Sequence, residues 1–318
     1  MKITVLAGGV GGARFLRGLR SAAPTDDITA IVNVGDDMWL AGLRICPDLD
    51  SIMYTLAGEN DEERGWGRVG ESERVSAELL AYGVGWPWFT LGDLDLGTHI
   101  TRTHYLRSGI PLSEATSKLT ARWPLGVRLV PATDDEVETH IETDSGTMHF
   151  QEWWTRHRAA IPARAFEFRG AVDSVPAPGV LAAIDEADVI VLAPSNPVVS
   201  IGSILAIPGI RSALITATAP VVGVSPIIGG RVVRGMADEC LSAIGVATSA
   251  DAVALHYGSR ASGGLLDAWL VDEADGALTR SIEAAGITAR AVPLWLHDPV
   301  AGAAVAAAAL ELALELAL

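Results

Sequence analysis

The amino-acid sequence predicts an α/β fold: a doubly wound, Rossmann-like, mostly parallel sheet with a helical insertion and a β-hairpin. Two observations carry this prediction. The apolar run at residues 3–6 leads directly into a glycine cluster, and a helical pattern follows at residues 13–19. Further along the chain, short and continuously apolar runs alternate with helical stretches, which is typical of parallel strands covered by helices on both faces.

The predicted strands after the first are short, and the buried-looking ones lack polar alternation. Between them, residues 71–124 read mainly as helical, with Ser113 and Glu114 as a helix start after Pro111, so we expect a helical insertion there. Residues 138–154 alternate on either side of an Asp-Ser-Gly turn, which predicts a hairpin. We expect one compound α/β domain over residues 1–318. The further strands are predicted at residues 28–34, 127–131, 189–192, 221–224, 253–256 and 268–271.

The glycine cluster is the first candidate binding site. Glycines at a tight strand-to-helix turn let backbone N–H groups and a helix N-terminus approach a phosphate. We therefore take Gly9, Gly11, Gly12 and Arg14 as nucleotide-binding candidates. The dinucleotide fingerprint is incomplete because Arg14 stands where its third glycine belongs, and no Gly-Lys-Ser/Thr follows. A tight turn without a ligand remains the alternative.

Composition narrows the classes of partner. The chain has 318 residues, of which 49% are hydrophobic, and a formal net charge of −16. This excess of negative charge argues against binding to nucleic acid or to a membrane surface. Cys46 and Cys240 belong to no metal-spaced motif, and no signal peptide precedes the first strand, so we expect a cytoplasmic protein. The apolar tail at 301–318 is interrupted by two glutamates, and we expect it to form a packed helix too short to span a bilayer.

Two acidic pairs follow the second predicted strand. Asp36 and Asp37 come directly after it, at an edge where ligands of doubly wound sheets bind. Asp48 and Asp50 lie two residues apart and share a face if the chain is extended, which suits a cation such as Mg²⁺. An acidic turn and a helix N-cap are the alternatives for these pairs.

A third acidic cluster follows a run of aromatic residues. Trp88, Phe89 and Thr90 stand just before Asp93 and Asp95. Aromatic rings stack on planar ligands, and neighbouring hydroxyl and carboxylate groups bind the polar edges of such ligands. Ordinary packing of the aromatic side chains is the alternative.

Two later loops also follow predicted strands. They contain Ser195 and Asn196 in one loop and Ser225 in the other. As small polar residues at strand C-termini, they are candidates for phosphate or base contacts, although each is also typical of a structural turn.

Taken together, these motifs resemble the 2-phospho-L-lactate transferase family of coenzyme F-420 biosynthesis, in particular its actinobacterial phosphoenolpyruvyl transferase branch (dehydro-coenzyme synthase). They occur in family order and cover most of the chain. The matching segments are GGVGGAR (8–14), NVGDD (33–37), PDLDSIMYTLAG (47–58), LGDLDLGTH (91–99), HFQEWW (149–154), APSNPVVSIG (193–202) and SPIIGG (225–230).

The resemblance implies a reaction. The terminal ribityl hydroxyl of the deazaflavin Fo attacks the distal phosphorus of enolpyruvyl-diphospho-5'-guanosine, and GMP leaves. It also implies Mg²⁺ as cofactor, small-molecule substrates and a homodimer. Asp50 and Thr90 match the Fo-contacting positions of the family.

Residue roles follow as hypotheses. We assign catalysis to Asp48 and Asp50. The metal candidates are Asp36, Asp37, Asp48 and Asp50; the Fo-binding candidates are Asp50, Trp88, Phe89 and Thr90; and the nucleotide-binding candidates are Gly9, Gly11, Gly12, Arg14, Ser195, Asn196 and Ser225. Alternatives are the same reaction with lactyl-2-diphospho-5'-guanosine as donor, an NAD(P)-dependent oxidoreductase, and a non-catalytic nucleotide or deazaflavin carrier.

Overall fold

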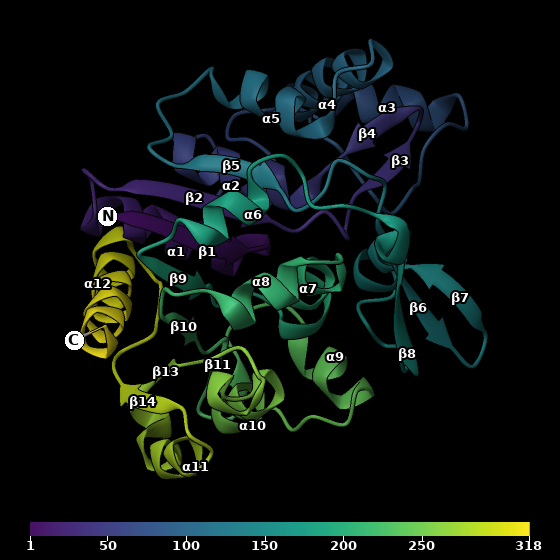
Figure 1. The fold of residues 1–318 in the computed structure, drawn as a ribbon. Coiled ribbons are helices and arrows are strands. Elements are labelled where there is room, and N and C mark those ends of the chain that lie inside the picture. The colour runs from purple at the N-terminus through teal and green to yellow at the C-terminus, as the bar shows by residue number, and fades with distance from the viewer. Residues whose placement is uncertain (318) are drawn as a thin grey trace.

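A parallel sheet forms the centre of the molecule (Figure 1). The structure is a computed structural model that describes residues 1–317. Every neighbouring pair of strands in the sheet is parallel, which confirms the predicted α/β class. The seven strands lie in the order β14 (Thr288–Ala291), β13 (Ala268–Val271), β10 (Val221–Val224), β9 (Val189–Leu192), β1 (Lys2–Ala7), β2 (Asp27–Val32) and β5 (Arg128–Pro131).

Helices cover both faces of the sheet, and alternate residues of β1 show the two cores. Ile3 and Val5 pack into the core beneath α1 (Gly9–Ala22), α2 (Pro47–Ala57) and α12 (Pro299–Leu316). Leu6 points to the other core, on the opposite face. Because both faces are buried, the strands need continuous apolar runs, which is why the sequence revealed most of them. Further helices are α6 (Val180–Asp185), α7 (Ser203–Ala206), α8 (Ile210–Thr216), α9 (Ala237–Ala243), α10 (Ala250–Tyr257) and α11 (Thr279–Ala284).

The packed C-terminal helix predicted from the sequence is α12, and it lies closely against α1. A Cβ added at Gly18 of α1 would lie 2.2 Å from the carbonyl carbon of Gly302 in α12, so the two backbones approach directly. By length and composition alone, α12 is long and apolar enough to cross a membrane, with a mean hydropathy of 1.6. The expectation that it is too short was therefore wrong, but its packing on α1 is that of a core helix.

The predicted helical region contains α3 (Arg74–Ala81), α4 (Asp93–Arg107) and α5 (Leu112–Thr120), which lie together above the sheet in Figure 1. The predicted hairpin is formed by β6 (Glu138–Thr143) and β7 (Gly146–His149). A further strand, β8 (Ala165–Arg169), pairs with β6. Two smaller hairpins are β3 (Met38–Leu40) with β4 (Leu43–Ile45) and β11 (Ile227–Ile228) with β12 (Arg231–Val232).

One predicted strand is wrong. Residues 253–256 belong to helix α10, because Ser249 caps its N-terminus by accepting a hydrogen bond from the Ala252 amide. A short apolar run does not by itself distinguish a buried helix from a buried strand. Strand β14 was missed because it lies at the sheet edge and is partly exposed, so it lacks an apolar signal. The hairpin also ends earlier than predicted, since Glu152–Arg156 forms a π-helical turn.

Candidate active site

The site lies where the strand order reverses. From β1 the chain moves to β2 and β5 on one side, and it returns to β9 on the other. Gly8 follows β1 and Ser195 follows β9, and the two residues are hydrogen-bonded to each other. The Gly8 amide donates to Ser195 Oγ over 3.0 Å, and that hydroxyl donates to the Gly8 carbonyl over 2.8 Å. Such switch points are where doubly wound sheets bind ligands.

Close packing explains most of the glycines in the first loop. A Cβ at Gly11 would lie 2.3 Å from the Pro194 carbonyl oxygen, and one at Gly12 would lie 2.9 Å from Ser195 Oγ. These two glycines therefore let the loop after β9 approach α1. Gly9 differs, because its φ of +62° requires glycine while the space beside it is more open.

Asp36 and Asp48 form a buried carboxylate pair. Asp36 follows β2, and Asp48 lies in the first turn of α2. The Asn33 side-chain amide donates to Asp48 Oδ2 over 2.9 Å, and a Cβ at Gly8 would meet the same oxygen at 2.5 Å. Asp36 Oδ1 is buried with no hydrogen-bond partner.

Electrostatics favour a cation between these two carboxylates. Burial, and next the charge of Asp48, raises the pKa of Asp36 well above its usual value. Burial also raises the pKa of Asp48 to about 6, although hydrogen bonds from Asn33 and the Gly9 backbone oppose the shift. Two buried carboxylates resist ionising together unless a cation or proton lies between them. The donor set is all oxygen and includes an orphaned atom, which fits Mg²⁺.

The other two predicted metal ligands face arginines instead. Asp37 lies 3.6 Å from the Arg44 guanidinium, and burial raises the pKa of Asp37 to about 7 against the charge of Arg44. Asp50 forms a direct ion pair with Arg102 of α4. Within the described part of the chain, residues 1–317, Asp37 and Asp50 each have an arginine as neighbour, whereas Asp36 and Asp48 form no ion pair with a cationic side chain.

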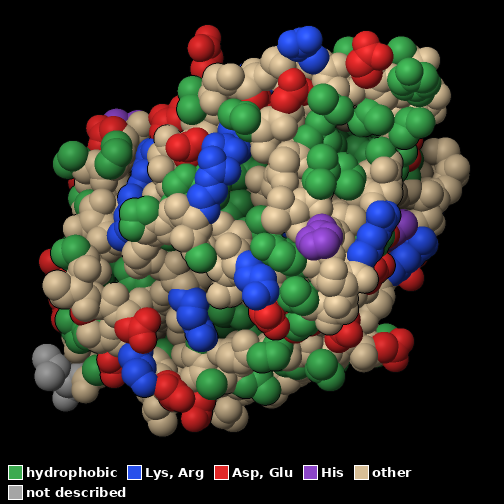
Figure 2. Space-filling view, turned by 90° about the horizontal axis from the view of Figure 1, so that it is seen from above, with side chains coloured by type: hydrophobic (Ala, Val, Ile, Leu, Met, Phe, Trp, Pro, Cys, Tyr) green, Lys and Arg blue, Asp and Glu red, His purple; other side chains and the backbone are tan. Residues whose placement is uncertain are grey.

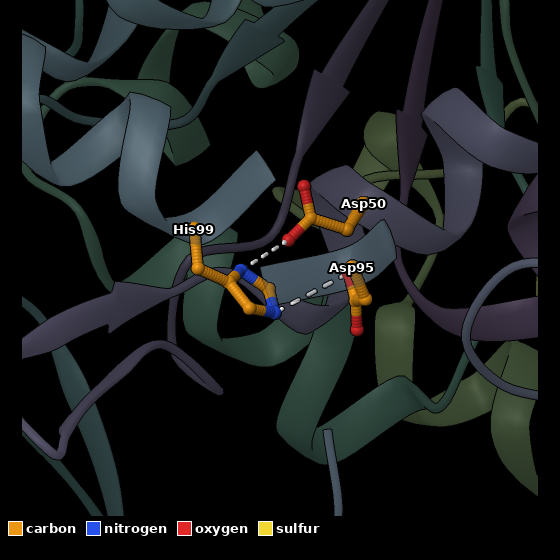
Figure 3. Close-up of side chains that lie close together, drawn as sticks. All are labelled: Asp50, Asp95 and His99. Carbon is orange, nitrogen blue, oxygen red and sulfur yellow. Dashed lines mark ion pairs between the residues drawn. The ribbon is translucent and has the colours of Figure 1, made fainter. Parts of the chain in front are cut away.

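Asp50 also belongs to a second group of titratable side chains. His99 lies between two carboxylates, with Nδ1 3.5 Å from Asp50 Oδ2 and Nε2 3.3 Å from Asp95 Oδ1 (Figure 3). The Tyr54 hydroxyl donates to Asp95 Oδ1 over 2.7 Å. Asp50, Asp95 and His99 are close enough together to hold a metal ion. Because Arg102 already neutralises the Asp50 carboxylate, we interpret Asp50, Asp95 and His99 as a network that holds protons and not a metal ion.

Sequence reasoning missed several members of this network. Arg44, Asp95, His99 and Arg102 are all buried. The sequence analysis noted Asp95 only as part of the third acidic cluster and assigned none of the four residues a role in the site. His99 and Arg102 stand at positions i and i+3 of α4, so they share one helix face. The available signal was their spacing after Asp95 in a helix that begins with a predicted acidic cluster.

The aromatic segment forms the wall of a separate apolar pocket. Phe89 and Thr90 line it together with Trp86 and leucines of β3, β4, α3 and α4. Trp88 is not among the lining residues, but its ring is stacked on that of Trp86 at a centroid distance of 4.6 Å. Figure 2 shows hydrophobic side chains gathered in one region of the face seen from above, the side on which α3 to α5 lie.

The remaining candidates have local hydrogen bonds. Asn196 Oδ1 caps the π-helical turn Pro197–Gly202 by accepting from the Val198 and Val199 amides. Ser225 Oγ donates to the Ile227 carbonyl over 2.9 Å within its own turn. Arg14 lies in another pocket, beside α2. These contacts shape the loops around the switch point, and they leave any ligand contacts of these residues as predictions.

Comparison with known proteins identifies the family. The family model described as 2-phospho-L-lactate transferase CofD matches residues 3–294. The chain belongs to the CofD family. It is therefore a transferase of coenzyme F-420 biosynthesis, and the oxidoreductase alternative loses its support.

Named relatives agree with this assignment, and a solved structure shares the fold. A protein of Streptomyces griseus named phosphoenolpyruvate transferase is 59% identical over 99% of both chains. Proteins with the same name from Thermobifida fusca and Mycobacterium avium are 57% and 51% identical, over 99% and 98% of this chain and 99% of each relative. The crystal structure of protein BH3568 from Bacillus halodurans has the same fold, with a TM-score of 0.63 at 20% identity, covering 97% of this chain and 99% of the other.

Proposed function

We propose that this CofD-family protein transfers a phosphoenolpyruvyl group from enolpyruvyl-diphospho-5'-guanosine to the terminal ribityl hydroxyl of Fo and releases GMP. The observation that carries the proposal is the buried pair Asp36 and Asp48, set beside the glycine turn after β1. The names of the actinobacterial relatives support the phosphoenolpyruvyl group as the unit transferred.

Two electrostatic features of the chain suit an anionic donor. The N-terminus of α1 carries the positive end of the helix dipole, and Gly9 begins that helix without a side chain that would obstruct a phosphate. Asp36 and Asp48 would hold Mg²⁺, which supplies positive charge to the phosphate oxygens when bound. Phosphoryl transfer depends mainly on such positioning and charge stabilisation.

Asp50 is proposed as the group that receives the proton of the attacking hydroxyl. In the transfer, the hydroxyl oxygen bonds to the distal phosphorus, the bond from that phosphorus to the bridging oxygen breaks, and the bridging oxygen leaves on GMP. Burial raises the pKa of Asp50, and the charge of Arg102 opposes this shift. The Asp50 carboxylate is therefore more basic than an exposed one and can take up the proton of the hydroxyl. His99 lies beside Asp50, and Asp95 lies on the other side of the His99 ring.

The aromatic pocket is proposed to bind the deazaflavin ring. Trp86, Phe89 and Thr90 line it, and stacked Trp88 supports the wall. Leu96, at the start of α4, lines this pocket and is the neighbour of Asp95, so a ring bound there would lie beside the network around Asp50. The homodimer and the cytoplasmic location expected from the sequence remain predictions.

The proposal is tested with purified protein, Fo and Mg²⁺, offering the enolpyruvyl and lactyl guanosine diphosphates in competition. Mass spectrometry should detect the enolpyruvyl product. The lactyl product alone would keep the mechanism and replace the donor. No product from either donor, with Fo still bound, would indicate a carrier.

Asp50→Asn tests the catalytic role in the same assay. The variant removes the charge and nearly preserves the shape, so turnover should fall at least about 100-fold if the residue accepts the proton. Near-normal turnover at saturating Mg²⁺ would remove Asp50 from this role.

A further inference from the structure

A second pocket lies one helical turn away from the carboxylate pair. Its walls come from the outer parts of α1 and α2 and from the loops around Trp66 and Arg234. Ser51 stands three residues after Asp48 on α2, and three residues correspond to about 4.5 Å along a helix. The pocket is therefore next to the proposed phosphate position but separate from the aromatic pocket.

The charged residues that line this pocket indicate what kind of ligand it could bind. Three arginines line it: Arg14, Arg17 and Arg234. Arg17 is neutralised by Glu62 at 2.5 Å, and Asp61, also in the lining, is paired with Arg64 at 3.3 Å. Among residues 1–317, neither Arg14 nor Arg234 has a carboxylate within 4 Å.

Two unpaired arginines facing one pocket are unusual in a chain whose net charge is −16. Burial, and next the charge of Arg234, lowers the pKa of Arg14, so each cation is unfavourable for the other. The guanidinium of Arg234 lies beside Gly65, where an added Cβ would lie 1.8 Å from Nη2. An anion between the two guanidinium groups relieves this repulsion.

The other lining groups indicate what kind of anion fits. Ser51, Thr55 and Asn60 offer neutral hydrogen-bonding groups, and Trp66 offers an apolar face. A planar carboxylate matches the fork geometry of arginine, and a small unsaturated carbon unit packs against an indole.

We propose that Arg14 and Arg234 bind the carboxylate of the three-carbon acid carried by the donor, in the pocket beside α2. The inference rests on the proposed function, because it assigns the acid half of the donor to this pocket and leaves the diphosphate at the glycine turn. It thereby replaces the expectation that Arg14 binds the nucleotide. Arg234 thereby becomes a donor-binding residue that the sequence motifs did not single out.

The test offers the two halves of the donor separately. Phosphoenolpyruvate and GMP are titrated individually against the full chain, with inorganic phosphate as a further probe, and binding is followed by tryptophan fluorescence and calorimetry. Trp66 lines the pocket and serves as a local reporter. The variants are Arg234→Gln and Arg14→Gln. Arg231→Gln is the control, since it removes the same charge from an exposed residue nearby that does not line the pocket.

We expect each pocket variant to weaken phosphoenolpyruvate binding about 10- to 100-fold, the usual loss for a charge-assisted hydrogen bond. GMP binding should change less than about twofold, and Arg231→Gln should change neither. Thermal unfolding checks that all variants are folded. Equal loss of GMP and phosphoenolpyruvate binding, loss of inorganic phosphate binding to the same degree as phosphoenolpyruvate, or no loss at all, would each overturn the assignment.

The same data separate this inference from the proposed function. If the wild-type protein makes product while Arg234→Gln binds phosphoenolpyruvate normally, the carboxylate site is wrong and the transferase stands. If no product forms but phosphoenolpyruvate binding still depends on Arg14 and Arg234, the carboxylate site stands and the proposed reaction is wrong.

Discussion

The side-chain amide of Asn33 donates a 2.9 Å hydrogen bond to Oδ2 of Asp48. The amide has a fixed orientation, because its oxygen accepts from the Gly35 backbone amide at 2.8 Å and from the Ser203 hydroxyl. The amide nitrogen of Asn33 is therefore turned toward the carboxylate pair, where it donates to Asp48. One oxygen of that carboxylate is held by the protein scaffold, and the other faces the glycine turn, where a Cβ at Gly9 would lie 3.9 Å from Oδ1.

Asp48→Asn should stabilise the metal-free protein at high pH. Burial raises the pKa of Asp48 from 3.8 to about 6, so ionised Asp48 opposes folding. Each pKa unit corresponds to about 1.4 kcal/mol, which gives a cost of up to about 3 kcal/mol. The cost is fully present above the folded pKa and disappears as the pH falls toward the unfolded value. Urea unfolding with EDTA between pH 4.5 and 8 measures it.

The variant should approach the wild-type stability near pH 4.5 and exceed it at pH 8. Mg²⁺ should stabilise the wild-type protein and have little effect on Asp48→Asn, because a ligand stabilises only the state that binds it. Asp185→Asn, at an exposed position, is the matched control. If Asp48→Asn were equally destabilised at both pH values, the inference that burial raises the pKa of Asp48 would be contradicted.

Arg102→Met should destabilise the protein strongly. Arg102 is 1% exposed, and its guanidinium pairs with Asp50 while donating to the Arg44 carbonyl at 3.2 Å. Removing one partner of a buried ion pair leaves a buried charge, which costs about 3–5 kcal/mol. The free energy of unfolding in urea, at pH 7, is the measurement.

A second substitution separates lost charge pairing from lost packing. Asp50→Asn combined with Arg102→Met should recover much of the loss, since no uncompensated charge then remains. If the double variant is as unstable as the sum of the two single variants, the pair contributes by packing and not by charge.

The features that could be predicted from the sequence alone are those that depend on residues close together in the chain. The glycine turn and the acidic residues after β2 depend on chain neighbours, so they were visible as patterns. The division of the aspartates was not visible, because Arg44 and Arg102 reach Asp37 and Asp50 through tertiary contacts from β4 and α4. Strand β14 was missed because its position at the sheet edge leaves it partly exposed and without an apolar signal. Residues 253–256 were predicted as a strand because a buried helix can contain the same short apolar run.

Gly8→Ala should abolish turnover and destabilise the protein. The new methyl group would lie 2.5 Å from Asp48 Oδ2 and 2.8 Å from Ser200 Cβ, so the carboxylate must move. Gly97→Ala is the contrasting variant, because this glycine lies inside α4 with open space beside it. There alanine should add about 0.5–1 kcal/mol of stability and leave activity intact. Equal effects of the two variants on activity would rule out the proposed contact.

Trp86→Ala should raise the KM for Fo and leave the KM for the guanosine donor nearly unchanged. Trp86 lines the apolar pocket and is stacked with Trp88 at 4.6 Å, so its loss removes both a stacking surface and the support of its neighbour. Loss of one base-type stacking contact costs about 1–3 kcal/mol, which corresponds to about 5- to 150-fold in KM. Trp295→Ala removes an exposed indole and is the control. A rise in the donor KM of the same size would place the nucleotide, and not the deazaflavin, in this pocket.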